Sequence, residues 1–258
     1  MDRYYLFILG SSGNVGTSFI KLISKNKNND IFEKIFLIDI KFNYDEIPKI
    51  ISNKCEFLSL DLSSEKETEK IFKKINPNKK NLIINLIAKD YPVNGEFNNN
   101  WSSFGPSPSE FQKVFDINLI IPYRISRIIV EKKLKNIRFI NIGSIYGIRT
   151  PHPEIYSFKD SRNKPSPYSI TKAGLISLVK YAALEFKKFG SESYMISFGG
   201  IESSLQDKNF IKKYNNRIVS GGLLNIDKAT ESMLKLSLLP WGTVSGSNFI
   251  IDNGYTIF

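Results

Sequence analysis

The sequence predicts a doubly wound α/β fold, in which helices cover both faces of a parallel sheet. Short apolar runs alternate along the chain with longer amphipathic stretches, which is the pattern of repeated strand–helix–strand units. The runs are apolar throughout rather than at every second residue, as expected for strands that are covered on both faces. We find neither an internal repeat nor a linker, so we expect a single domain over residues 1–258.

In the first half of the chain, strands are expected where apolar runs are too short to form a helix. These strands are residues 4–9, 35–40, 56–60 and 81–88, and the helices between them are residues 15–24 and 64–74. The first run leads into glycines rather than into a small-residue cleavage site, so it is a strand and not a signal peptide. We therefore expect a cytoplasmic protein.

The second half continues the alternation with longer helices. Helices are expected over residues 111–133 and 169–189, and strands over residues 138–142, 193–198 and 248–252. Two long segments without periodicity remain, at about residues 90–109 and 149–167. Loops of that length in a compact domain are usually functional or mobile, so we expect them to be substrate-binding insertions.

Composition and charge exclude several kinds of site. The chain has one cysteine, Cys55, and one histidine, His152, which excludes a disulfide framework and any site that needs two imidazoles, so no metal is expected. No apolar run approaches the roughly 20 residues of a membrane span. The net charge of +11 comes mostly from lysines rather than from arginine-rich stripes, so we do not expect nucleic-acid binding. A small anionic molecule remains a possible partner.

A glycine-rich segment follows the first strand and precedes the first helix, as a phosphate-binding loop requires. Its residues are Gly10, Ser12, Gly13, Asn14, Val15 and Gly16. Glycines let the backbone approach a pyrophosphate, and the helix N-terminus supplies N–H groups and a positive dipole. Asp39 closes the second strand, where a carboxylate accepts hydrogen bonds from an adenosine ribose and repels a 2′-phosphate. The pattern indicates a site for NAD, and NADP is not excluded.

A tyrosine and a lysine at the start of a long helix indicate acid–base chemistry. Tyr168 and Lys172 are four residues apart, so they lie on one helix face. A nearby ammonium stabilises a phenolate and lowers the pKa of the phenol, which suits proton transfer to a carbinol oxygen. Ser144 follows the fifth strand, at the sheet edge where open α/β sheets bind ligands.

These motifs, taken in order, resemble the short, single-domain branch of the short-chain dehydrogenase/reductase family, and the resemblance covers nearly the whole chain. It implies a Rossmann-type fold in which Ser144 orients the substrate oxygen and Tyr168 is the acid/base. It further implies that Lys172 lowers the pKa of Tyr168 and holds the nicotinamide ribose, and that Asn118 holds a proton-relay water. The other cofactor-binding residues that it implies are Asp61, Leu62, Asn85, Ala88, Gly199 and Ile201.

The same resemblance implies that the segment after Ile201, about residues 202–222, closes over cofactor and substrate. It also implies that the helices at residues 111–133 and 169–189 pair across a two-fold axis. We therefore expect a homo-oligomer, a tetramer or a dimer.

The substrate is expected to be a sugar. The stretch between Ser144 and Tyr168 is longer than in the commonest members of the family, and its sequence resembles oxidoreductases of flagellin modification and nonulosonic (legionaminic-type) acid biosynthesis. Its basic residues suit a sugar phosphate or nucleotide sugar. The candidate substrate-binding residues are Asp90, Tyr91, Arg149 and His152. A 3-oxoacyl or general carbonyl reductase is the alternative, and a non-catalytic cofactor-binding protein is a further one.

Overall fold

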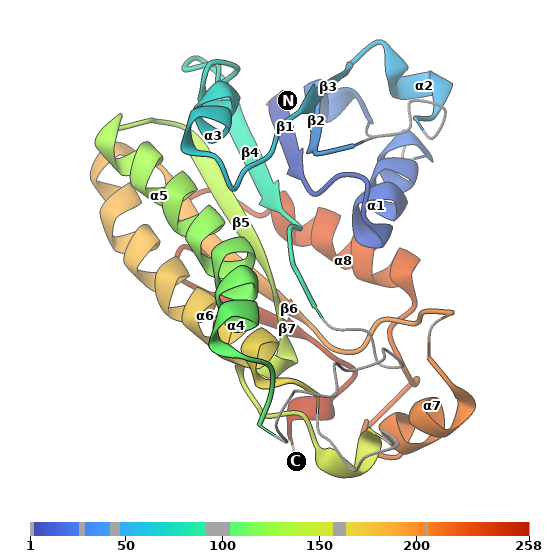
Figure 1. Cartoon of the computed structure of the whole chain (residues 1–258). Coiled ribbons are helices and arrows are strands. Elements are labelled where there is room, and N and C mark those ends of the chain that lie inside the picture. The colour runs from blue at the N-terminus through green and yellow to red at the C-terminus, as the bar shows by residue number, and fades with distance from the viewer. Residues whose placement is uncertain are drawn as a thin grey trace.

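The chain folds around one parallel sheet (Figure 1). The computed structural model describes residues 3–25, 29–41, 47–90, 104–156, 164–204 and 206–257. Within these residues, seven strands pair in the order β3-β2-β1-β4-β5-β6-β7. They are β1 Tyr4–Leu9, β2 Phe32–Asp39, β3 Cys55–Ser59, β4 Lys80–Asn85, β5 Ile137–Ser144, β6 Glu192–Phe198 and β7 Asn248–Ile251. The order reverses between β1 and β4, and ligands bind beyond the carboxyl ends of strands at such a reversal.

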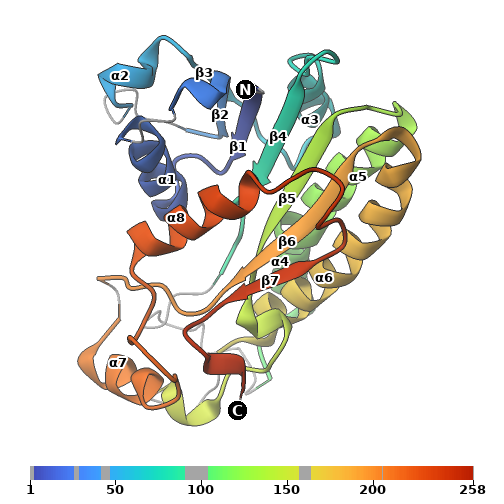
Figure 2. The same ribbon diagram turned by 180° about the vertical axis from the view of Figure 1, so that it is seen from behind.

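Helices cover both faces of the sheet. One face carries α1 Asn14–Lys25 and α8 Ile226–Ser237 (Figure 2), and the other carries α3 Glu65–Phe72, α5 Ile121–Glu131 and α6 Ser166–Phe186. Adjacent side chains of a strand point to opposite faces. Leu6 and Ile8 of β1 therefore pack in the core under α1 and α8, and Phe7 and Leu9 pack in the core on the other side. None of the described helices combines the length and the apolar composition that a membrane crossing requires.

The α/β fold expected from the sequence is confirmed, but the helix expected over residues 111–133 is interrupted. α4 Pro108–Phe115 and α5 are joined by a π-helical turn over Asp116–Ile120, where the Ile121 N–H donates to a carbonyl five residues back. Pro122 has no N–H to donate to the carbonyl of Asn118, four residues back. The expected helix is therefore present as two α-helical segments with a π-helical turn between them, because Pro122 breaks the α-helical ladder at Asn118.

The structure also contains helices that the sequence analysis did not predict. α8 was not expected, and α7 Lys208–Asn215 lies within the expected loop at residues 202–222. Both helices begin at a side-chain cap: Asp207 accepts from the Phe210 N–H, and Asn225 accepts from the Asp227 N–H. Those caps are a sequence signal for a helix start that could have revealed both elements. A short helix, α2 Lys49–Ser52, precedes β3.

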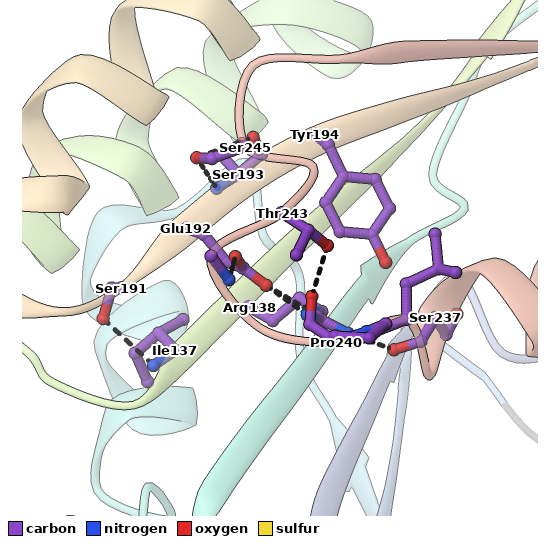
Figure 3. Close-up of polar contacts among 12 residues, drawn as sticks. Ile137, Arg138, Ser191, Glu192, Ser193, Tyr194, Ser237, Pro240, Thr243 and Ser245 are labelled. Carbon is purple, nitrogen blue, oxygen red and sulfur yellow. Dashed lines mark hydrogen bonds and ion pairs between the residues drawn. The ribbon is translucent and has the colours of Figure 1, made fainter.

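A buried ion pair joins β5 to β6 at their amino-terminal ends (Figure 3). Arg138 and Glu192 are paired residues of the two strands, and both are almost completely buried. The Arg138 guanidinium also donates to the carbonyl oxygens of Ser237 at 2.7 Å and Leu239 at 2.8 Å. The Glu192 carboxylate accepts from the Gly242 N–H at 2.8 Å. The pair therefore connects two central strands to the segment after α8.

Removing one charge of this pair is expected to destabilise the protein. Glu192→Gln keeps the size of the side chain but leaves the Arg138 guanidinium buried without a counter-ion, and we expect a loss of about 3–5 kcal/mol in the free energy of unfolding. Glu67→Gln removes a carboxylate from an exposed pair with Lys70 and is the matched control, with an expected loss below about 1 kcal/mol. Urea unfolding of both variants measures the difference, and equal losses would contradict the assignment.

Candidate functional site

The loop between β1 and α1 is suited to bind a phosphate. Gly10 adopts a φ of +80°, and a Cβ on Gly16 would lie 2.5 Å from the carbonyl oxygen of Ser11, so both positions require glycine. The Ser11 hydroxyl is buried, and the described residues provide no hydrogen-bond partner for it. α1 has no acidic residue in its first turn. Backbone N–H groups and the positive end of a helix dipole therefore meet at this loop.

A cavity of about 510 Å³ lies beside this loop, at the carboxyl ends of β1, β2 and β4. The residues of the predicted cofactor set that line it are Gly10, Ser12, Gly13, Asp39, Asp61, Leu62 and Ala88. The Asp39 carboxylate accepts from the Ser12 N–H at 3.0 Å and from the Ile40 N–H at 2.8 Å. These two bonds hold the carboxylate at the wall of the cavity. A dinucleotide fits this arrangement, with a phosphate at the loop and a ribose at Asp39.

A second cavity, of about 310 Å³, contains the predicted catalytic residues Ser144, Tyr168 and Lys172. It shares the wall residues Leu86 and Ala88 with the first cavity. Ser144 ends β5, and its side chain hydrogen-bonds that of Tyr168 in the first turn of α6. Lys172 lies on the next turn of α6, with its ammonium 5.7 Å from the centre of the Tyr168 ring. The three side chains thus meet at the carboxyl edge of the sheet.

Burial dominates the electrostatics of this group. Burial raises the pKa of Tyr168 well above its usual value and the Asp90 carboxylate raises it further, whereas the hydrogen bond with Ser144 lowers it. Burial lowers the pKa of Lys172 to about 8, and Asp90 acts in the opposite direction. The Lys172 ammonium donates to the carbonyl oxygen of Ile142 at 2.8 Å. At neutral pH, the site therefore holds a phenol beside an ammonium.

Asn118 lies behind the catalytic cavity, on the π-helical turn. Its side-chain oxygen accepts from the Lys89 N–H at 2.7 Å, and its amide donates to the Lys89 carbonyl at 3.0 Å and to the Thr171 hydroxyl at 3.1 Å. Asn118 therefore links the segment after β4 to α6. Its own carbonyl is the one that Pro122 leaves without an α-helical donor, and it can accept a water instead.

The structure brings several other predicted residues to the catalytic cavity. Its walls include Val15, Gly199 and Ile201, which were predicted to bind the cofactor, and Asp90, which was predicted to bind the substrate. Asn14 and Gly16 lie in the first turn of α1. Asn85 is buried and does not line either cavity: it donates to the Asn141 side chain at 2.9 Å and accepts from the Ile87 N–H. It shapes the wall of the cofactor cavity from behind.

The structure does not bring all the predicted substrate-binding residues to one cavity. Tyr91 lies outside the described residues. Arg149 and His152 do not line the catalytic cavity, but line a separate groove together with Arg217 and Tyr255. The Tyr255 ring stacks on Tyr214, which does line the catalytic cavity, so aromatic rings separate the two hollows. A role of Arg149 and His152 in substrate binding stays a prediction.

The sequence analysis missed part of the cavity wall. Tyr146, Tyr156, Phe210 and Tyr214 line it and form an aromatic cluster with Tyr255. Lys164 also lines it, and in the sequence it is only one of several basic residues in the stretch between Ser144 and Tyr168. No spacing rule connects Lys164 to Asp90, because the contact joins segments far apart in the chain.

Comparison with known proteins assigns the chain to one family. A family model described as enoyl-(acyl carrier protein) reductase, of the short-chain alcohol dehydrogenase type, matches residues 35–256. The chain belongs to the short-chain dehydrogenase/reductase family. The catalytic residues expected from the resemblance, Ser144, Tyr168 and Lys172, all lie within the matched part.

Individual relatives are distant. A short-chain dehydrogenase from Leptospira borgpetersenii serovar Hardjo-bovis, solved with bound NAD+, is 27% identical over 100% of this chain and 94% of its own, with a TM-score of 0.75. A 4-hydroxyisoleucine dehydrogenase complexed with NADH is 21% identical, with a TM-score of 0.72 over 98% of this chain and 99% of its own, which shows the shared fold. An uncharacterized oxidoreductase of Thermotoga maritima is 27% identical, and the match spans 57% of each chain.

The buried Lys172 makes the stability of the ligand-free protein depend on pH. Its pKa is about 8 in the folded state against an ordinary value of 10.5, so the unfolded chain binds more protons between these values. Stability therefore rises with pH across this window. We expect wild type to gain on the order of 2 kcal/mol more than Lys172→Met as the pH rises through the window. Urea unfolding at both ends measures this gain, and parallel pH profiles of the two proteins would contradict it.

Proposed function

We propose that the protein is an NAD(P)-dependent oxidoreductase that interconverts an alcohol and a carbonyl on a sugar or sugar derivative. The observation that carries the proposal is the meeting of Ser144, Tyr168 and Lys172 in a cavity that shares wall residues with the cavity beside the glycine-rich loop. The NAD+ bound to the Leptospira relative supports the choice of cofactor. When bound, the nicotinamide supplies or accepts the hydride.

The cofactor would be held by groups of this chain along both cavities. The loop at Gly10 and the start of α1 would hold the pyrophosphate, and Asp39 would accept hydrogen bonds from the adenosine ribose. Lys172 would hold the nicotinamide ribose, as the resemblance implies. The wall shared by the two cavities, at Leu86 and Ala88, then lies along the middle of the dinucleotide.

The chain's own residues handle the proton. In the reducing direction, a carbonyl, NAD(P)H and one proton give an alcohol and NAD(P)+. Ser144 donates a hydrogen bond to the carbonyl oxygen and orients it. Tyr168 gives its phenolic proton to that oxygen as the alcohol forms, and the Lys172 ammonium stabilises the phenolate that remains. Asn118 holds the water through which Tyr168 regains a proton, as the resemblance implies.

A sugar is the proposed substrate because charged and polar side chains line the catalytic cavity. Asp90 and Lys164 both face it, and Gln206 is part of its wall. The likeness of the stretch after Ser144 to enzymes of flagellin modification and nonulosonic acid biosynthesis supports a role in making surface carbohydrate. A 3-oxoacyl or general carbonyl reductase is the second candidate, and the acyl carrier protein in the description of the matching family model favours an acyl substrate. Turnover of a panel of sugars and of acyl thioesters separates the two.

The proposal includes self-association and a cytoplasmic location. Tyr123 of α5 and Tyr181 and Leu184 of α6 are large and exposed on the outer surface of these helices. Covering them with a second copy would remove apolar surface from water, which supports a homodimer or homotetramer. A cytoplasmic location fits a dependence on NAD(P), which is regenerated there.

Tyr168→Phe tests the proton donor. It removes the transferable proton and keeps the ring, so we expect kcat to fall by about 10²–10⁴-fold while the Kd of the cofactor barely changes. Lys172→Ala should lower kcat and weaken cofactor binding, because the same ammonium stabilises the Tyr168 phenolate and holds the nicotinamide ribose. Tyr5→Phe, at the amino end of β1, is the matched control. Steady-state kinetics and cofactor fluorescence measure both quantities. Near-normal kcat in Tyr168→Phe would refute this route for the proton.

Asp39→Asn tests the choice between cofactors. The wild-type carboxylate would accept hydrogen bonds from the ribose hydroxyls and would repel a 2′-phosphate. We therefore expect NADH to bind more tightly than NADPH. The amide removes the charge, and we expect the ratio of the two Kd values to move toward NADPH by about tenfold. Asp30→Asn, which removes an exposed charge paired with Lys54, should leave the ratio unchanged. Tighter NADPH binding by wild type would contradict the role of Asp39.

A further inference from the structure

A second charged pair lies inside the catalytic cavity. Lys164 Nζ is 2.7 Å from Asp90 Oδ2, and both residues line the same cavity as Ser144 and Tyr168. The Lys164 side chain is 7% exposed and that of Asp90 is 37% exposed. The ammonium is thus almost enclosed, while a molecule in the cavity can reach the carboxylate.

The surroundings of Lys164 leave hydrogen-bonding capacity for a ligand. Its ammonium lies 5.1 Å from the centre of the Tyr168 ring, 5.8 Å from that of Tyr146 and 6.0 Å from that of Tyr156. Aromatic rings attract a cation but do not replace carbonyl or carboxylate acceptors. An ammonium has three N–H donors, and within the described part of the chain Asp90 is its hydrogen-bond acceptor. The pair therefore offers donors on one side and an accessible carboxylate on the other.

Stability alone does not account for this pair. A buried ion pair contributes little to stability, because the cost of removing both charges from water offsets their attraction. Lys164 and Asp90 lie in the segments before α6 and after β4, next to the catalytic tyrosine. The Asp90 carboxylate raises the pKa of both Tyr168 and Lys172, as expected of a charge close to them.

We propose that Asp90 and Lys164 together bind a hydroxyl group on the carbon next to the reacting one, so that the substrate is an α-hydroxy carbonyl and the product a vicinal diol. The inference rests on the proposed function and narrows its substrate class. A hydroxyl accepts from the ammonium and donates to the carboxylate at the same time. A methylene can do neither, and an anion is repelled by Asp90. The pair is therefore a specificity device that favours sugars over acyl chains at this position.

The test compares two ring ketones that differ by one hydroxyl, 2-hydroxycyclohexanone and cyclohexanone. Each is reduced by NADH and a proton, to cyclohexane-1,2-diol or cyclohexanol together with NAD+. A hydrogen bond to a charged group changes binding by about 10- to 100-fold, so we expect wild-type kcat/KM to be higher for the hydroxyketone by that factor. Lys164→Met keeps the aliphatic stem and removes the ammonium, and the ratio of the two kcat/KM values should fall at least about tenfold.

Two further variants make the result decisive. The double variant Lys164→Met with Asp90→Asn removes both charges of the pair, so neither is left buried without the other. It should therefore fold if a single variant does not, and it should also lose the preference. Lys79→Met breaks a more exposed ion pair with Glu33, just before the amino end of β4 and away from the cavity. It should keep the wild-type ratio.

The outcomes separate the inference from the proposed function. Equal wild-type turnover of the two ketones would refute the inference and leave the oxidoreductase assignment standing. Lys164→Met could instead lose activity equally on both ketones and shift the pH profile. That result would show that Lys164 acts through Tyr168, and it would also overturn the inference. If wild type reduced neither ketone nor any sugar or acyl thioester with either cofactor, the proposed function would fail, and the inference with it.

Discussion

The ion pair between Arg138 and Glu192 sets the register of the two strands on which the catalytic site depends. Because the two residues are partners across β5 and β6, the same register places Ser144 opposite Phe198 at the other end of the strands. Gly199 and Ile201 follow Phe198 and line the catalytic cavity. A slip by one residue would turn one strand over relative to the other and separate the two buried charges. The position of Ser144 relative to the segment after β6 is therefore determined partly at the opposite end of the sheet.

Parallel strands explain why a small set of side chains suffices at that end. All carboxyl ends of such strands lie on one edge, so residues that follow different strands meet there without long loops. Asp39 ends β2, Ser144 ends β5 and Asp90 lies beyond β4. Helix α6 then adds Tyr168 and Lys172 to the same edge, and the segment before it adds Lys164. The result is a cavity in which three charged groups lie close to the Tyr168 phenol. These groups belong to Asp90, Lys164 and Lys172.

The sequence could predict those parts of the protein that depend on local pattern. Uniformly apolar runs revealed the strands, and the spacing of Tyr168 and Lys172 on one helix face revealed the catalytic pair. Contacts between distant segments have no such signature. A lone arginine at the start of β5 gives no sign that it is buried, and Lys164 gives none of its pairing with Asp90. Helix α8 was missed because its apolar residues are few and a single cap residue, Asn225, marks its start.

The π-helical turn at Asn118 has a consequence for the two helices it joins. A π turn holds one more residue than an α turn, so the chain after it is rotated by about 100° relative to an uninterrupted helix. The apolar side chains of α5 at Ile121, Ile125 and Ile128 face the sheet in this rotated phase. An unbroken helix with the same sequence would have to turn either these side chains or those of α4 away from their neighbours. The single proline at position 122 thus lets one stretch of sequence serve two surfaces that are out of phase with each other.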